Sequence, residues 1–170
     1  MKRSTRFHNQ LRTLCFLAVL AALMIVLQVA MSGLPNIEAV TLLVILTACH
    51  FGYRALLPVG VFILVEGLIF GFHIWWINYL YVWPLLVVIV VLLRRWSHPL
   101  LWAVAAGFFG LFFGTLCSIP YFLTGGPGAG VGYILQGIPY DLAHCLGNVV
   151  IVGLLYKPLD HTLAKLLKKA

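Results

Sequence analysis

Three polar side chains share one face of an otherwise apolar segment, IPYDLAHCLGNVVIVGLLY at 138–156. The spacing of Asp141, His144 and Asn148 places them in one narrow stripe of a helix. A carboxylate, an imidazole and an amide can bind a polar solute, exchange protons or hold a metal ion. Burying a charge in a bilayer costs about 2.5–3.5 kcal/mol or more, so such residues face the protein interior or a water-filled cavity. The stripe therefore predicts one wall of a cavity.

Further polar candidates lie in other apolar segments. Glu38 opens one segment and Glu66 lies past the middle of the next, whereas Asp160 is in the C-terminal tail. The stretch HIWWINYLYVWP at 73–84 adds flat, rigid rings of the kind that line small-molecule pockets. We predict that one solute-binding cavity is surrounded by Glu38, Glu66, Trp76, Asn78, Tyr79, Asp141, His144 and Asn148.

These residues also have structural interpretations. Glu38, at the start of a helix, complements the positive end of the helix dipole. Asp141 and His144 can form a hydrogen-bonded pair that joins two helices. The rings of 73–84 can form the aromatic belt that anchors helices at the membrane surface. A cavity is favoured because Glu38, Glu66 and Asp141 all fall in the same half of the predicted membrane layer.

The composition predicts an all-α integral membrane protein. Of the 170 residues, 63% are hydrophobic and 9% are charged, and the mean hydropathy is +1.07. Soluble domains contain about 25% charged residues, so this chain has too few to cover a water-exposed surface. The sequence has no Gly-rich nucleotide-binding motif, no H-E-x-x-H pattern and no C-x-x-C pair. We therefore expect no catalytic residue, no metal site and no enzyme activity.

Six apolar segments are long enough to cross a bilayer, which takes about 17–25 residues. When these segments alternate in direction, all 11 Lys and Arg residues fall on one side. The positive-inside rule makes that side the cytoplasm, and it holds both termini. The net charge of +7 therefore reflects topology rather than nucleic-acid binding. The single predicted domain has spans at 13–32, 37–53, 55–72, 77–93, 99–119 and 133–156, with basic cytoplasmic tails at 1–12 and 157–170.

Glycine and alanine spacing gives three further expectations. The Gly-rich segment 118–133 is predicted to be an external loop, either a plain connector or a movable lid over the cavity. Gly110 and Gly114 lie one turn apart in the fifth span, which indicates close packing between helices. Ala18 and Ala22 have the same spacing in the first span. They indicate either internal packing or a docking face for another membrane subunit.

The chain resembles a known family in four segments: FLAVLAALMIVLQ (16–28), LPNIEAVTLLVIL (34–46), LVEGLIFGFHIWWINYLYVWP (64–84) and SIPYFLTGGP (118–127). In these four segments, and in having six short predicted helices, the chain resembles the substrate-binding S components of energy-coupling factor (ECF) transporters. The resemblance implies a subunit of the bacterial plasma membrane that captures a vitamin or related micronutrient from outside. It also implies delivery through a membrane coupling subunit and two cytoplasmic ATPases, so that only the partners use ATP and no cofactor is covalently bound. Ala18 and Ala22 would then contact the coupling subunit.

The predicted charges restrict the solute. Acids without a neighbouring Lys or Arg repel a carboxylate ligand and offer it no partner, which argues against biotin-, folate- or pantothenate-like compounds. A neutral or cationic ring compound fits better, and a large neutral corrinoid also agrees with the charge. Two other functions stay open. One is a stand-alone membrane carrier or channel, and the other is a membrane enzyme that uses Glu66, Asp141 and His144 as acid–base groups or metal ligands.

Overall fold

The structure, a computed structural model, describes the backbone of residues 2–96 and 98–169 and the side chains of 8, 10–96 and 98–168. All regular elements in this part are helical, which confirms the predicted class. The basic side chains of Lys2, Arg3, Arg6 and Lys169 in the predicted tails lie outside the described side chains. The elements are α1 (Lys2–Met31), α2 (Val40–Phe51), the 3-10 helix η1 (Gly52–Ala55), α3 (Leu56–Phe70), α4 (Ile74–Leu93), the 3-10 helix η2 (Arg94–Trp96), α5 (Pro99–Leu111), α6 (Phe113–Cys117) and α7 (Ile119–Lys169).

Four helical stretches of the described chain have the length and apolar composition to cross a membrane. They are Gln10–Met31, Val40–Phe70, Ile74–Trp96 and Ile119–Lys168. A helix satisfies most of its backbone polar groups internally, as a bilayer requires. The predicted number of six spans and the side of the membrane that holds the termini stay predictions.

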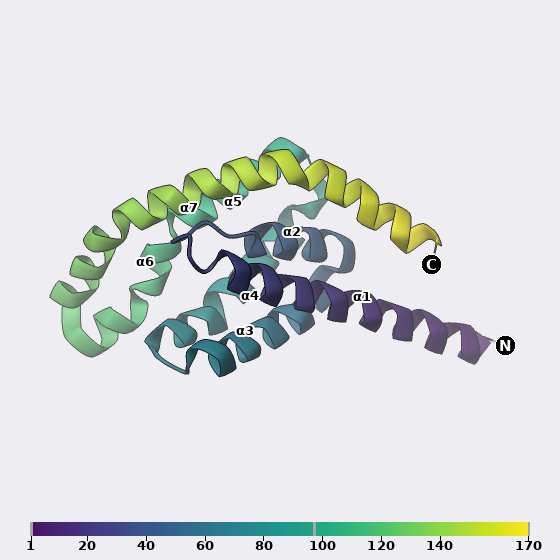
Figure 1. Cartoon of the computed structure of the whole chain (residues 1–170), viewed down its shortest axis with the longest axis horizontal. Helices are drawn as coiled ribbons and strands as arrows, with labels where there is room; N and C mark the ends of the chain where they lie inside the picture. The colour runs from purple at the N-terminus through teal and green to yellow at the C-terminus, as the bar shows by residue number, and fades with distance from the viewer. Residues whose placement is uncertain (1, 97, 170) are drawn as a thin grey trace.

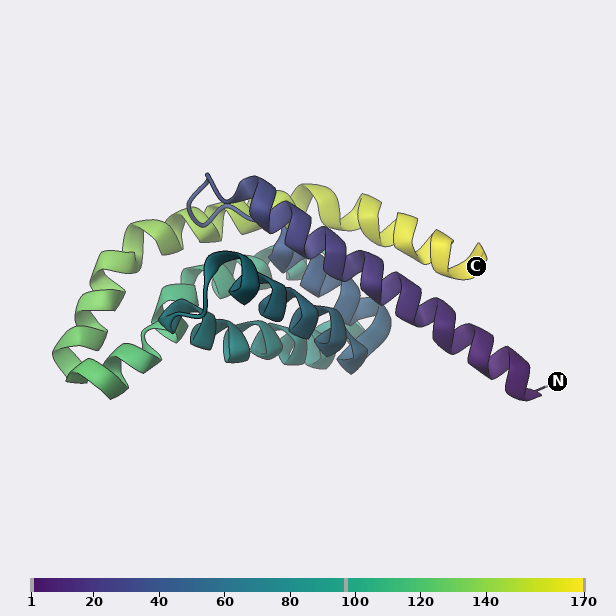
Figure 2. The same ribbon diagram turned by 60° about the horizontal axis from the view of Figure 1, so that its bottom comes forward.

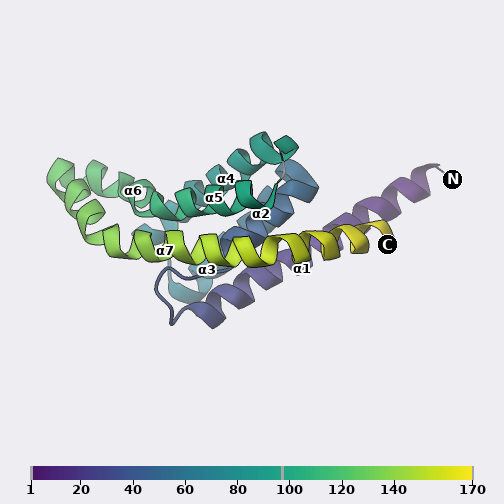
Figure 3. The same cartoon turned by 90° about the horizontal axis from the view of Figure 1, so that it is seen from above.

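The helices run alternately between two ends of the molecule (Figure 1). α1, α3 and α5 leave the end that holds both termini, and α2, α4 and most of α7 return to it, as Figure 3 also shows. The connections that contain Arg54 and the pair Arg94–Arg95 lie at this same end. The basic residues are therefore gathered as the alternating topology predicts.

Many large apolar side chains are exposed, although the core is also apolar. Large apolar residues are among the most exposed, with Leu123, Leu154 and Leu68 at 82%, 69% and 67%. Soluble proteins normally expose their charged and amide groups instead. Here the buried polar residues are Glu38, Thr41, Thr47, Glu66, Asn78, Ser118, Asp141, His144 and Asn148. Such a surface suits apolar surroundings.

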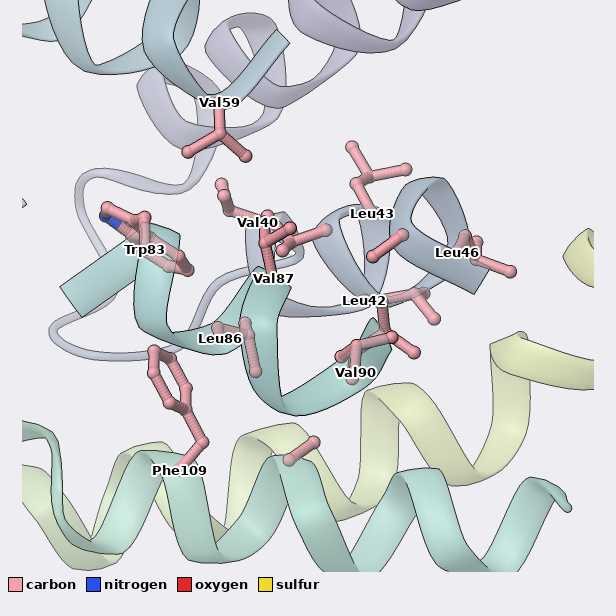
Figure 4. Packing of buried hydrophobic residues seen from close by; sticks show 14 of the residues in the cluster. Val40, Leu42, Leu43, Leu46, Val59, Trp83, Leu86, Val87, Val90 and Phe109 are labelled. Atoms are coloured by element: carbon pink, nitrogen blue, oxygen red, sulfur yellow. The ribbon is translucent and has the colours of Figure 1, made fainter. Parts of the chain in front are cut away.

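α2 forms the centre of the bundle. Its residues from Val40 to Ala48 are all buried, and a helix that is apolar all round belongs inside a protein rather than at its surface. At 12 residues it is about 18 Å long, which is shorter than a bilayer core. Figure 4 shows Leu86, Val87 and Val90 of α4 lying next to α2, with Val59 of α3 and Phe109 of α5 on either side.

The prediction of a loop at 118–133 is wrong. This segment is helical on both sides of Gly126, where φ is +75° and ψ is −176°. Glycine adopts positive φ without strain and ends the first helix there, and Pro127 has the fixed φ that suits the first position of the next helix. One residue therefore turns the chain between the two helices.

Several predicted helix boundaries also differ. α2 begins at Val40 rather than 37, because the Glu38 carboxylate accepts the Thr41 N–H at 2.8 Å and holds the preceding residues outside the helix. The predicted fifth span is interrupted at Phe112. The described residues of the two predicted tails, 2–12 and 157–169, continue α1 and α7 as helix, and Arg12 donates to the Leu167 carbonyl.

The two small-residue patterns have different surroundings. A Cβ on Gly110 would lie 2.8 Å from backbone atoms of α7, so glycine permits the close approach of α5 and α7 that its spacing predicts. Ala18 and Ala22 are instead exposed on the outer face of α1. Internal packing is therefore excluded for these two alanines, and the docking face stays a prediction.

Candidate functional site

A cavity of about 290 Å³, which we call the central cavity, lies where several helices begin or end. Its wall consists of the end of α1, the connection 32–39 and parts of α3, α4, α6 and α7. Figure 2 shows this connection projecting at the end of α1, away from the two termini. Glu38, Glu66, Tyr79 and His144 line the cavity, so the structure brings together four residues that the sequence predicts for one site.

A chain of buried hydrogen bonds, which we call the polar relay, holds His144 in place. The Glu38 carboxylate accepts the Thr41 N–H and the Thr41 hydroxyl. His144 Nε2 lies 3.1 Å from Glu38 Oε1, and because a carboxylate accepts, the imidazole donates from this nitrogen. Asn148 Nδ2 donates to Thr41 Oγ1 at 3.4 Å and to the Ala106 carbonyl at 3.2 Å. The relay fixes the orientation of the imidazole ring.

Both expected roles of Glu38 occur together. It accepts a backbone N–H at the first turn of α2, as a carboxylate that complements the helix dipole does. It also contacts His144 and lines the central cavity. Asp141 and His144, in contrast, do not form the alternative pair. Each contacts a different helix end.

Four buried polar atoms on residues that line the central cavity have no hydrogen-bond partner within the described chain. They are Gln28 Oε1, Glu66 Oε1, Trp83 Nε1 and His144 Nδ1. Leaving such a group unpaired costs about 1–3 kcal/mol, so native proteins rarely accumulate them in one place. The concentration of these atoms around one cavity indicates a place for a polar solute or for water.

Aromatic rings form one side of the central cavity around Tyr79. Its ring centroid lies 5.1 Å from that of Trp75, 5.6 Å from that of Trp83 and 6.5 Å from that of Phe113, each in edge-to-face geometry. Edge-to-face pairs are favourable and fix the relative orientation of the rings. All four residues line the cavity. The rings therefore provide a rigid apolar wall. In a site of this kind a few polar groups are enough to orient the ligand and make binding specific.

Two residues of α4 that the sequence predicts for the site, Trp76 and Asn78, do not line the central cavity. Trp76 does not line the central cavity, because its indole Nε1 donates to the Ile63 carbonyl at 2.9 Å. Asn78 is buried beside the Tyr81 hydroxyl at 3.0 Å, and that hydroxyl donates to the Leu116 carbonyl at 2.7 Å. These contacts join α4 to α3 and α6.

Asp141 belongs to a second cavity of about 290 Å³, the side cavity. Its Oδ1 accepts the Gly114 N–H at 2.9 Å, at the break between α5 and α6 where this donor has no partner within the helix. Asn36 and Phe113 line both cavities, so they form the partition between them. Asn148 lines neither cavity and belongs to the polar relay.

Five contributors to the central cavity or the relay are absent from the predicted site: Gln28, Thr41, Trp75, Trp83 and Phe113. Gln28 is an amide near the end of an apolar helix, and Thr41 follows Glu38 by three residues as a capping partner would. Both signals are readable in the sequence. Trp75 and Trp83 belong to the stretch 73–84, whose rings suit either the membrane surface or a pocket wall, and Phe113 is one apolar residue among many, so these three had no distinguishing signal.

In the described part of the chain, no group of three or more His, Cys, Asp or Glu side chains is arranged to hold a metal ion. The site is therefore defined by its cavity, its rings and its unpaired polar atoms. Comparison of the chain with protein-family models, curated proteins and solved structures gives no match.

Proposed function

We propose that this protein is a substrate-binding membrane subunit that captures a small ring compound, as the S components of ECF transporters do. In this proposal the chain crosses a bacterial plasma membrane six times, with both termini and the basic connections in the cytoplasm. The central cavity opens to the outside. A membrane coupling subunit and two ATPases then deliver the bound compound to the cytoplasm.

The observation that supports solute capture is the set of unpaired polar atoms around the central cavity. Glu66 and His144 are each 2% exposed and Trp83 is 1% exposed, yet each has an unpaired polar atom and lines the cavity. A ligand that pairs with these atoms recovers the cost of their burial, which favours binding. In a core that serves only packing, unpaired buried polar atoms would lower stability without any benefit.

The size of the central cavity supports a small ligand. Small-molecule sites occupy about 300–1,000 Å³, and this cavity, at about 290 Å³, is near the lower limit. It fits a compound with one or two rings and is too small for a corrinoid. Of the solutes that agree with the charges, the small neutral or cationic ring compounds remain.

The exposed face of α1 supports a partner in the membrane. Ala18 and Ala22 are exposed one turn apart, and small residues at this spacing let another helix approach closely. Exposed Leu14 and Val26 extend the same apolar surface in both directions along the helix. We assign the docking of the coupling subunit to this face.

Mass spectrometry of small molecules that co-purify with the detergent-solubilised protein tests the proposal. We expect one compound of one or two rings, present near one per chain in the wild type and depleted in His144→Ala. Asp160→Asn, whose carboxylate pairs with His50 at 2.8 Å outside the cavity, is the matched control and should retain it. Recovery of no compound from the wild type would contradict solute capture.

Reconstitution separates this function from a stand-alone carrier. We expect liposomes that contain the protein alone to take up none of the co-purified compound. Uptake should require the coupling subunit, the ATPases and ATP. Uptake by the protein alone would instead support the carrier.

A further inference from the structure

The central cavity has carboxyl groups but no fixed positive charge in its wall. Glu38 and Glu66 line it, and no described Lys or Arg does. The described basic side chains of Arg54, Arg94 and Arg95 lie in connections at the opposite end of the molecule. His144 is the one lining residue that can add a positive charge, and it is directed at Glu38.

The polar relay accounts for one of these two carboxylates. Glu38 accepts from the Thr41 N–H, the Thr41 hydroxyl and His144 Nε2, so its oxygens are bound by three donors. Several donors of this kind satisfy a buried carboxylate. Glu66 is different, because it is 2% exposed and its Oε1 has no donor within the described chain. The group that lacks a counter-charge is therefore Glu66.

The surroundings of Glu66 suit a cation. The rings of Trp75, Tyr79 and Trp83 line the same cavity, and aromatic faces attract organic cations, more strongly when water is excluded. Gln28 Oε1 and Glu66 Oε1 can only accept, whereas Trp83 Nε1 can only donate. Acceptors therefore outnumber donors among the unpaired atoms whose role is fixed. These unpaired atoms are best satisfied by a ligand that has more hydrogen-bond donors than acceptors.

We infer that the central cavity selects a small ring compound with one positive charge, which is placed against Glu66 between the rings. The charge is that of a protonated amine or of a ring nitrogen. This inference rests on the proposed function and narrows its substrate from neutral or cationic compounds to cations. Trp83 Nε1, as the unpaired donor, meets one acceptor on the same ligand.

Binding of matched pyridines to the full-length, detergent-solubilised protein tests the inference. After co-purified ligand has been removed by dialysis, four probes are titrated by calorimetry: 1-methylnicotinamide, 3-(aminomethyl)pyridine, nicotinamide and nicotinate. The first has a charged ring nitrogen, the second a protonated amine, the third no charge and the fourth a carboxylate. The set varies charge at nearly constant size, and the first two distinguish the two sources of positive charge.

We expect at least one cation to bind about tenfold or more tightly than nicotinamide, and nicotinate to bind most weakly. Glu66→Gln should remove the preference for the cation while nicotinamide binding changes less than about threefold. Asp160→Asn, which alters a carboxylate outside the cavity, should keep the preference. The wild-type order alone is decisive if the Glu66 variant does not fold.

The inference is overturned if neither cation binds more tightly than nicotinamide, or if the preference persists in Glu66→Gln. A neutral co-purified compound in the mass spectrometry would also overturn it and would leave solute capture intact. Absence of any co-purified compound would count against the proposed function itself. The two failures are therefore distinguishable.

Discussion

Replacing Gly110 by alanine tests whether α5 and α7 approach as closely as the structure shows. The added Cβ would lie 2.8 Å from Cys145 N and from His144 C, and 2.9 Å from His144 O. These are backbone atoms, so no side-chain rotation relieves the contact. Gly153 offers a matched control for the same pair of helices, because a Cβ there would lie 3.9 Å from Ala103 Cβ, an ordinary contact.

The magnitude follows from the geometry. Ordinary contact begins at 3.4 Å and the Gly110 Cβ would lie at 2.8 Å, so the helices must separate by about 0.6 Å. Overpacking of this kind costs about 1–3 kcal/mol, whereas the gain in helix propensity from glycine to alanine is about 1 kcal/mol. The gain is common to both variants. Gly110→Ala should therefore be less stable than Gly153→Ala by about 1–3 kcal/mol.

The same displacement affects the site. His144 is one of the residues pushed by the new Cβ, and a shift of about 0.6 Å brings its 3.1 Å contact with Glu38 to the limit of hydrogen-bond reach. Unfolding in mixed detergent micelles, followed by tryptophan fluorescence, measures the stability, and retention of the co-purified compound measures the site. If Gly110→Ala is as stable as Gly153→Ala and retains the compound equally, the close approach at this residue is wrong.

Three further predictions concern other contacts. Thr41→Val removes the hydroxyl between Glu38 and Asn148, so it should lower the unfolding free energy by about 1–3 kcal/mol and weaken ligand retention. The control is Thr47→Val, whose hydroxyl donates to a carbonyl of its own helix. Equal losses in the two variants would contradict a special role for the relay. Trp76→Phe should lower the unfolding free energy by about 1 kcal/mol through its lost hydrogen bond, and a change in ligand affinity would contradict its place outside the cavity. Ala22→Trp should leave stability and ligand retention unchanged and abolish co-purification with the coupling subunit, and intact co-purification would remove this face from docking.

The sequence predicts the interior polar residues correctly because burial in a membrane is costly for them. Glu38, Glu66 and His144 had to face inward whatever the details of packing, and the cavity lies where they meet. The short connection predicted between the second and third spans, at Arg54, lies within η1 between α2 and α3.

Other features depend on information that polarity does not contain. Asn78 and His144 are both polar and both 2% exposed, yet only His144 lines the central cavity. Which interior residue borders an unfilled space depends on how the neighbouring rings pack. Phe113 divides the two cavities but has no property that separates it from other phenylalanines of the chain. The glycines of 118–133 suggested a loop because glycine favours turns, whereas the structure is helical on both sides and departs from helical geometry at Gly126.

The uninterrupted course of α7 beyond Gly126 has a mechanical consequence. His144 at the cavity and Lys168 near the C-terminus are on one helix, about 36 Å apart at 1.5 Å per residue. If this segment tilted as one body by about 5° at His144, Lys168 would move by about 3 Å, because displacement grows with distance from the pivot. Pro158 lies between the two residues and has no backbone N–H to donate, so bending at this point would reduce the movement that reaches Lys168.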